Sequence, residues 1–131
     1  MCIGNACRSQ MAEAFARAYG GDVMIPASAG LAPATRVAND TLEAMAEKGL
    51  DLHDHFPKSI RHLGRAEFDL VVNMSGSNLP DVPAAGIAEW DVEDPVAMRY
   101  ERHCEVRDRI EALVIRLILD LRAEALRARQ P

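Results

Sequence analysis

The chain has 131 residues, of which 49% are hydrophobic and 27% charged, which is ordinary for a folded globular domain. The formal net charge of −5 argues against nucleic acid or an anionic membrane surface as partner, because neutralising phosphates requires a basic face. No apolar run reaches membrane-spanning length and the opening residues show no secretory pattern, so we expect a single cytoplasmic domain over residues 1–131.

The first predicted elements are a helix and a strand. Apolar side chains recur at helical spacing from Arg8 to about Tyr19, and the Gly20–Gly21 pair ends that helix. Residues 22–30 predict a short strand, and Pro26 near its end indicates a sheet edge or a bulge, because proline has no backbone N–H.

The middle of the chain predicts a second helix and a helical turn. Residues 39–49 carry helical spacing, with Asn39 or Asp40 as the N-terminal cap and Gly49 as the terminator. Residues 57–64 then predict one or two helical turns.

The second half predicts a parallel sheet covered by a long helix. Residues 68–74 form a continuous apolar run, typical of a strand buried on both faces, and residues 86–92 predict a weaker strand. Strands that alternate with helices indicate an α/β domain. The last helix packs on the sheet through an apolar stripe at helical spacing, made by Val106, Ile110, Leu113, Val114, Leu117, Ile118 and Leu121.

The opening loop predicts an oxyanion cradle. Three cysteines cannot all pair within one chain, so in a reducing compartment they serve chemistry or packing. A loop that leads into a helix presents free N–H groups at the positive end of the helix dipole. Gly4 is free to adopt unusual backbone angles, and Asn5 tolerates the left-handed region, so successive N–H groups can point inward. The predicted cradle consists of Ile3, Gly4, Asn5, Ala6, Cys7, Arg8 and Ser9.

Cys2 lies at the floor of this cradle as the predicted nucleophile. The forked guanidinium of Arg8 can hold two oxygens of a bound anion. An electropositive setting stabilises a thiolate, and Ser9 can donate a hydrogen bond to it. A thiolate beneath a tetrahedral oxyanion is aimed at phosphorus or arsenic.

The Cys-x5-Arg-Ser sequence "CIGNACRS", followed by "QMAEAF", resembles the signature of the low-molecular-weight protein tyrosine phosphatase superfamily. Within this superfamily, the sequence is most similar to the branch of thioredoxin-coupled arsenate reductases. The likeness continues through "SAG" at 28–30, "EAMAEKGLDL" at 43–52, "DLVVNM" at 69–74, "WDVEDP" at 90–95 and "VRDRIEALV" at 106–114. It implies a three-layer α/β/α fold with a small parallel sheet, catalysis by Cys2, Arg8 and Asp94, and neither a cofactor nor a metal.

Asp94 is assigned as the general acid by this resemblance alone. The segment 89–94 offers Glu89, Asp91, Glu93 and Asp94, and residue type cannot choose among four acids. The resemblance selects the acid before Pro95, which restricts the preceding residue to extended geometry. One carboxylate can protonate a leaving group and later activate water.

Three functional hypotheses follow. The favoured one is a cysteine-dependent phosphatase-type hydrolase that cleaves phosphomonoesters, including those of phosphoproteins, through a phosphocysteine. The first alternative is an arsenate reductase that uses an external thiol or a glutaredoxin-type partner, because residues 75–83 lack the second and third cysteines of the thioredoxin-coupled branch. The second alternative is a non-catalytic oxyanion-binding module.

The other cysteines and the histidines receive weaker assignments. The resemblance makes Cys7 a redox partner of Cys2, with simple packing as the equal alternative. Cys104 is expected to be structural, and His62 and His103 to lie on the surface. An H-x-H pair at His53 and His55, without a third ligand, favours a polar loop over a metal site.

The resemblance also implies a buried strand of about five to seven residues before the loop. Only Met1 precedes Cys2 in this sequence. We therefore expect either that the natural protein starts further upstream or that another segment or subunit supplies the strand.

Overall fold

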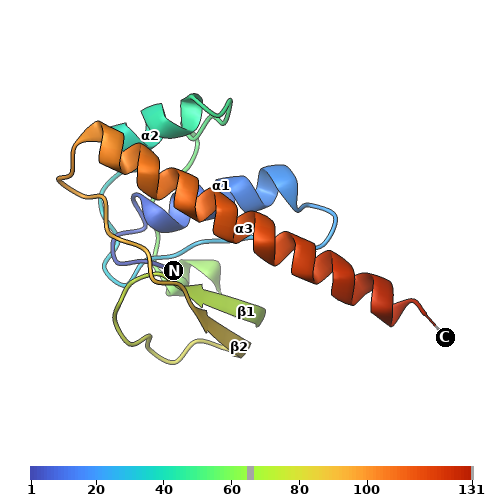
Figure 1. The fold of residues 1–131 in the computed structure, drawn as a ribbon. Coiled ribbons are helices and arrows are strands. Elements are labelled where there is room, and N and C mark those ends of the chain that lie inside the picture. Colours follow the sequence, from blue (N-terminus) through green and yellow to red (C-terminus); the bar gives the residue numbers. More distant parts are fainter. Residues whose placement is uncertain (65–66, 131) are drawn as a thin grey trace.

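The first helix, α1 (Arg8–Tyr19), leads directly out of the opening loop, as predicted. The computed structural model describes residues 1–64 and 67–130, and α1 lies behind the long last helix in the view of Figure 1. Gly20 caps α1 and donates its N–H to the carbonyl of Ala16 at 2.8 Å. A Cβ at Gly20 would lie 2.8 Å from Cγ1 of Ile118, so this glycine lets the two helices approach closely.

Helix α2 (Asn39–Ala46) confirms the second predicted helix but not its cap. The N-cap is Ala38, in extended geometry and without a side-chain hydrogen bond, so the prediction of Asn39 or Asp40 as cap is wrong. Asp40 instead lies in the first turn, where its negative charge interacts favourably with the positive end of the helix dipole. Gly49 has a φ of 74° and its N–H donates to the Ala46 carbonyl at 2.9 Å, so it does end this helix.

The prediction of a strand over residues 22–30 is wrong. This segment contains only an isolated bridge residue, Gly30, which pairs in parallel with Cys2 on one side and with Ser59 on the other. Pro26 has no N–H to give to a ladder, and Ile25 is 99% exposed, so only residues 28–30 of this segment are fully buried. The helical turn predicted after this segment is confirmed as η1 (Ile60–Leu63).

The sheet consists of β1 (Phe68–Asn73) and β2 (Ala84–Glu89), which run parallel with Phe68 opposite Ala84 and Asn73 opposite Glu89. Both predicted strands are confirmed, with bounds shifted by one or a few residues. Burial of β1 on both faces is not confirmed, because Leu70 is exposed and burial is concentrated toward Asn73.

The other edge of β1 contacts the start of the chain. The amino group of Met1 donates to the carbonyl of Val72, and the N–H of Met74 donates to the Met1 carbonyl at 2.8 Å. These bonds place Cys2 beside the end of β1, at the edge where ligands of parallel sheets collect.

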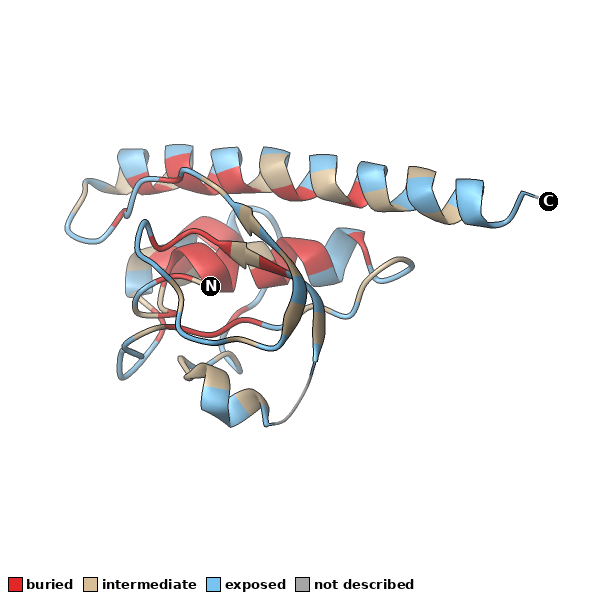
Figure 2. Cartoon of the chain, turned by 90° about the horizontal axis from the view of Figure 1, so that it is seen from below, coloured by how far each residue is buried: buried red, intermediate tan, exposed pale blue. Residues whose placement is uncertain are grey.

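Helix α3 (Tyr100–Ala128) confirms the predicted long amphipathic helix. It packs against α1 and α2, so the prediction that it packs on the sheet is not confirmed, and η1 lies on the opposite side of the strands (Figure 2). The α/β architecture with a small parallel sheet is thus confirmed. None of the described helices has an apolar stretch long enough to cross a membrane. The core between α1 and α3 is made by Met11, Phe15, Met45, Leu52, Met74, Val106, Ile110, Val114 and Ile118.

Candidate active site

The opening loop is held by its carbonyl groups. Backbone N–H groups of the segment 31–38 donate to the carbonyls of Cys2, Ile3, Gly4 and Ala6 over 2.8 to 3.1 Å. Every peptide bond described is trans, and in a trans peptide the N–H points away from the preceding carbonyl. The N–H groups of the residues that follow each of these carbonyls are therefore turned away from the segment 31–38.

These N–H groups remain without a protein partner. Within the described residues, no backbone N–H from residue 3 to residue 9 donates to a protein acceptor. The last two belong to the first turn of α1, where intrahelical acceptors do not exist. Buried N–H groups that converge at a helix N-terminus form a site for an anion.

Asn5, not Gly4, adopts the unusual backbone conformation of this loop. Asn5 has a φ of 51°, whereas the φ of Gly4 lies outside the left-handed region. The prediction for Gly4 is therefore wrong, and that for Asn5 is confirmed. Gly30 is the glycine that the loop requires, because a Cβ there would lie 2.7 Å from the Ile3 carbonyl oxygen and 2.8 Å from the Asn5 nitrogen.

Side-chain hydrogen bonds fix the direction in which Ser9 donates. Oδ1 of Asn5 accepts from Nε2 of Gln10 and from the N–H of Lys58, both at 3.0 Å, which leaves Nδ2 as the donor. Nδ2 donates to Oγ of Ser9 at 2.7 Å. The Ser9 hydroxyl already accepts this bond, so its own hydrogen is free for Sγ of Cys2, 2.9 Å away. This arrangement stabilises a thiolate.

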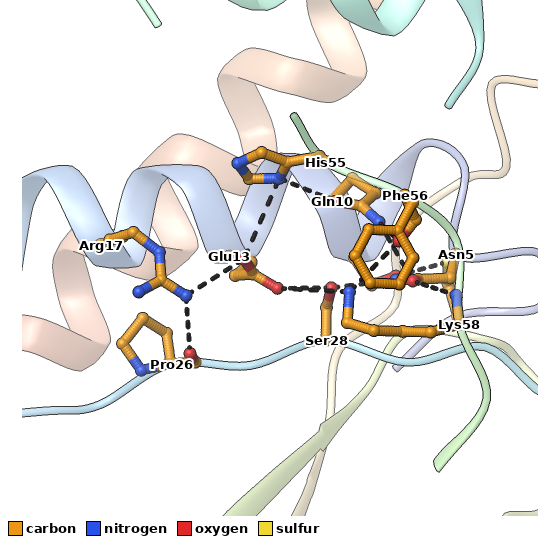
Figure 3. Close-up of polar contacts among 11 residues, drawn as sticks. Asn5, Gln10, Glu13, Arg17, Pro26, Ser28, His55, Phe56 and Lys58 are labelled. Carbon is orange, nitrogen blue, oxygen red and sulfur yellow. Dashed lines mark hydrogen bonds and ion pairs between the residues drawn. The ribbon is translucent and has the colours of Figure 1, made fainter. Parts of the chain in front are cut away.

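The same amide is anchored at its other hydrogen by a buried chain of hydrogen bonds (Figure 3). Nδ2 of Asn5 also donates to Oγ of Ser28 at 3.0 Å, and Ser28 donates to the carboxylate of Glu13 at 2.7 Å. Arg17 and Lys58 lie 3.2 and 3.9 Å from that carboxylate and neutralise its charge. Ser28 therefore supports the loop through hydrogen bonds.

Arg8 and Asp94 meet at the predicted site. Nη2 of Arg8 lies 3.5 Å from Oδ2 of Asp94, while Nη1 donates to the carbonyls of Met74 and of Val92, the latter at 3.1 Å. The guanidinium is buried, and the Asp94 side chain is 44% exposed. Backbone groups from two different loops thus hold one end of the guanidinium in place.

The other three carboxylates of this segment lie elsewhere. Glu93 forms an ion pair with Arg102 at 2.6 Å, and Glu89 accepts from Asn73 at 3.2 Å. Asp91 contributes its backbone carbonyl to Arg109. Among the residues described, Asp94 is the acid that contacts Arg8.

Cys7 is as buried as Cys2 and lies near Thr41, a residue that the sequence did not single out. Both cysteines are 3% exposed. Burial raises the pKa of the Cys7 thiol, and the nearby Thr41 hydroxyl opposes that rise. Thr41 also lies 3.0 Å from Nε2 of His103, which is buried. The prediction of a surface position for His103 is wrong, because this face of α3 packs onto α2.

The remaining histidines and Cys104 lie apart from the cradle. His53 is exposed and pairs with Asp51, whereas Nδ1 of His55 contacts Gln10 at 3.0 Å. In the described part of the chain, no three His, Cys, Asp or Glu side chains are arranged to hold a metal ion. His62 is exposed, as predicted. Cys104 contacts Glu47 at 3.4 Å.

Comparisons with known proteins agree with this geometry. The family model for low molecular weight phosphotyrosine protein phosphatases matches residues 1–128. The chain belongs to this family. The glutaredoxin arsenate reductase of Synechocystis sp. is 32% identical over 122 residues, covering 90% of this chain and 92% of the relative. Arsenate reductase 2 of Staphylococcus epidermidis is 33% identical over 118 residues, covering 87% and 89%.

A solved structure leads to the same group. The structure described as an arsenate reductase in the phosphate binding state has a TM-score of 0.83 and 31% identity, covering 92% of this chain and 94% of its own. The chain is therefore an enzyme of the phosphatase and arsenate reductase kind, and a non-catalytic module is no longer a candidate. The comparisons favour the arsenate reductase hypothesis over the phosphatase hypothesis that the sequence favoured.

Proposed function

We propose that this enzyme reduces arsenate to arsenite, with Cys2 as nucleophile and an external thiol or a glutaredoxin-type partner as electron donor. One observation carries the proposal: seven consecutive N–H groups, those of residues 3–9, have no protein acceptor, and they belong to the loop that follows the Cys2 thiol, which is itself paired with Ser9. Relatives named arsenate reductases, at 32 to 33% identity, supply the choice of oxyanion.

The first step joins sulfur to arsenic. The Cys2 thiolate attacks the arsenic of bound arsenate, and one arsenic–oxygen bond breaks. That oxygen leaves as water after it takes up protons, and the carboxyl group of Asp94 beside Arg8 supplies one of them. The loop N–H groups and the Arg8 guanidinium hold the other oxygens and their developing charge.

The second step transfers electrons. Arsenic(V) gains two electrons to become arsenic(III), and two thiols lose them to form one disulfide, so each arsenite released requires one dithiol or two monothiols. Residues 75–83 contain no cysteine, so no thiol from that loop is available. The electrons therefore come finally from an external thiol, such as glutathione or the dithiol of a glutaredoxin in the reducing cytoplasm that the cysteine content predicts.

Arsenite formation tests this function. Purified protein with arsenate, glutathione and a glutaredoxin is assayed for arsenite, and the same protein is assayed for phosphate release from an aryl phosphate without reductant. We expect thiol-dependent arsenite formation that is lost in Cys2→Ser and retained in Cys104→Ser. Phosphate release without any arsenite formation would overturn the proposal and restore the phosphatase hypothesis, with a phosphoprotein among its substrates.

A further inference from the structure

One nitrogen of the Arg8 guanidinium is required both by the protein and by a bound oxyanion. The two N–H groups of Nη1 donate to backbone carbonyls, those of Met74 and Val92. A forked contact to an anion therefore has to use Nη2 together with Nε. Nη2 is also the atom that lies 3.5 Å from Oδ2 of Asp94. The carboxylate and the anion thus compete for the same donor.

The ion pair between Arg8 and Asp94 is partly protected from solvent. The Arg8 side chain is 5% exposed and the Asp94 side chain 44% exposed. Such a pair is screened less than a pair on the open surface, so an anion that breaks it loses part of its own binding free energy. A carboxylate that pairs with a guanidinium also has no proton to donate. The acid role of Asp94 therefore requires a second arrangement of this side chain.

The chain on either side of Asp94 is anchored. The side chain of Glu93 pairs with Arg102 of α3 at 2.6 Å, and the N–H of Val96 donates to Oδ1 of Asp94 at 3.1 Å. Oδ2 can therefore leave Nη2 by rotation of the side chain, without movement of the segment that carries it. The carboxyl group then stays beside the cradle, within reach of a bound anion.

We propose that Asp94 is a built-in competitor of the oxyanion. A tetrahedral dianion that binds to the cradle displaces the carboxylate from Nη2, and Oδ2 of the displaced carboxylate takes up one proton from solvent. That proton is the one that Asp94 later gives to the leaving oxygen, a part of the inference that rests on the proposed function. Binding of the anion and protonation of the acid thus occur together.

The groups near Asp94 explain why the displaced carboxylate is protonated. It lies beside a dianion that now shares its cation, and like charge favours the neutral acid. Burial lowers the pKa of the nearby His103 of α3, so this imidazole is uncharged at neutral pH. Burial raises the pKa of Cys7, which stays a thiol, and Cys2 as a thiolate adds negative charge. None of these groups replaces the positive charge of Arg8.

Sulfate binding tests the competition, because sulfate is a tetrahedral dianion that does not titrate between pH 5 and 8. All proteins carry Cys2→Ser, so the nucleophile does not titrate either. This parent is compared by titration calorimetry, in buffers of different ionisation enthalpy, with Asp94→Asn, which keeps the shape without the charge. Asp91→Asn is the matched control, because Asp91 is an exposed acid of the same segment whose backbone carbonyl contacts Arg109.

We expect Asp94→Asn to bind sulfate at least about tenfold more tightly than the parent at pH 7, because the competing charge is gone. The parent takes up about one proton per sulfate bound, so its affinity falls as the pH rises. Asp94→Asn lacks this proton uptake, and the two affinities approach each other as the pH falls. A merely structural effect of the substitution would not depend on pH in this way. Asp91→Asn follows the parent at every pH.

Three results would overturn the inference. Equal sulfate affinities of the parent and Asp94→Asn at pH 7, or weaker binding by Asp94→Asn, would show that the carboxylate does not compete. Equal proton uptake in the two proteins would show that Asp94 is not the group that is protonated. Absence of sulfate binding from every variant would overturn the competition together with the cradle.

Arsenite formation separates this inference from the function it rests on. If wild type forms arsenite but the sulfate affinities are equal, the inference fails and the proposed function stands. If wild type forms no arsenite but Asp94→Asn binds sulfate more tightly and without proton uptake, the function fails and the competition stands. In an active enzyme, Asp94→Asn should lower the KM for arsenate together with kcat, whereas a merely structural defect would raise KM.

Discussion

Asn5 and Ser9 are joined by a buried hydrogen bond of 2.7 Å from Nδ2 to Oγ, and this bond directs the Ser9 hydrogen toward Cys2. Asn5 also holds a left-handed backbone conformation. Alanine tolerates the left-handed conformation less well than asparagine, and Asn5→Ala also leaves the buried hydrogen-bond partners of the amide unpaired. We therefore expect Asn5→Ala to lower the free energy of unfolding, measured with urea, by about 2–4 kcal/mol. The exposed Asn78→Ala is the control. A loss below about 0.5 kcal/mol in Asn5→Ala would contradict this role.

Gly30 is predicted to be the sensitive glycine of the site. A Cβ in Gly30→Ala meets the backbone of Ile3 and Asn5 within 2.8 Å, whereas in Gly4→Ala the nearest atom is the Ala34 Cβ at 3.7 Å. Displacing the loop moves the nucleophile, so we expect arsenite formation to fall by about 100-fold in Gly30→Ala. Gly4→Ala should keep most of the activity. The reverse order of the two rates is the result that this geometry forbids.

Asp94 is predicted to act as the acid because it contacts Arg8 at the cradle. Asp94→Asn keeps the shape but removes the transferable proton, so we expect the rate of arsenite formation to fall by about 10²- to 10⁴-fold. Asp91→Asn is the matched control, because the Asp91 group that contacts Arg109 is a backbone carbonyl. Similar rates in the two variants would show that the carboxylate takes no part in proton transfer.

The buried position of His103 predicts how stability depends on pH. Burial holds its pKa below the ordinary value of 6.5, so the unfolded chain binds a proton more readily than the folded one. The stabilisation is present above pH 6.5 and is lost as the pH falls through the folded value. In urea unfolding between pH 5 and 8, His103→Gln should flatten this decline, and His62→Gln should leave it unchanged. An identical decline in wild type and His103→Gln would contradict the assignment.

The helices and the parallel strands were predictable because each follows a local pattern. The apolar stripe from Val106 to Leu121 predicts α3 from side chains three or four residues apart. Gly20 marks the end of α1 because it directly follows the last helical residue. The segment 22–30 was not predictable in the same way. Its pairing is limited to Gly30, whose partners Cys2 and Ser59 are distant in sequence.

The candidate site shows the same division. The "CIGNACRS" motif predicted Cys2, Arg8 and Ser9 as site residues, and the family resemblance of "WDVEDP" predicted Asp94. Both predictions were possible because each signal lies within one short stretch of sequence. Thr41 and His103 carry no such signal. They meet each other because α2 and α3 pack together, and an isolated histidine on an amphipathic helix is ordinarily assigned to the surface.

The proposed function depends above all on whether the N–H groups of residues 3–9 bind an oxyanion. Amide NMR resonances of the Cys2→Ser variant are followed while inorganic phosphate is added, and Arg8→Lys in the same background serves as comparison. We expect saturable shifts concentrated in residues 3–9, and an affinity for phosphate at least about tenfold weaker with lysine, because an ammonium cannot reproduce the paired contacts of a guanidinium. Amides at these positions that do not respond to phosphate would contradict it.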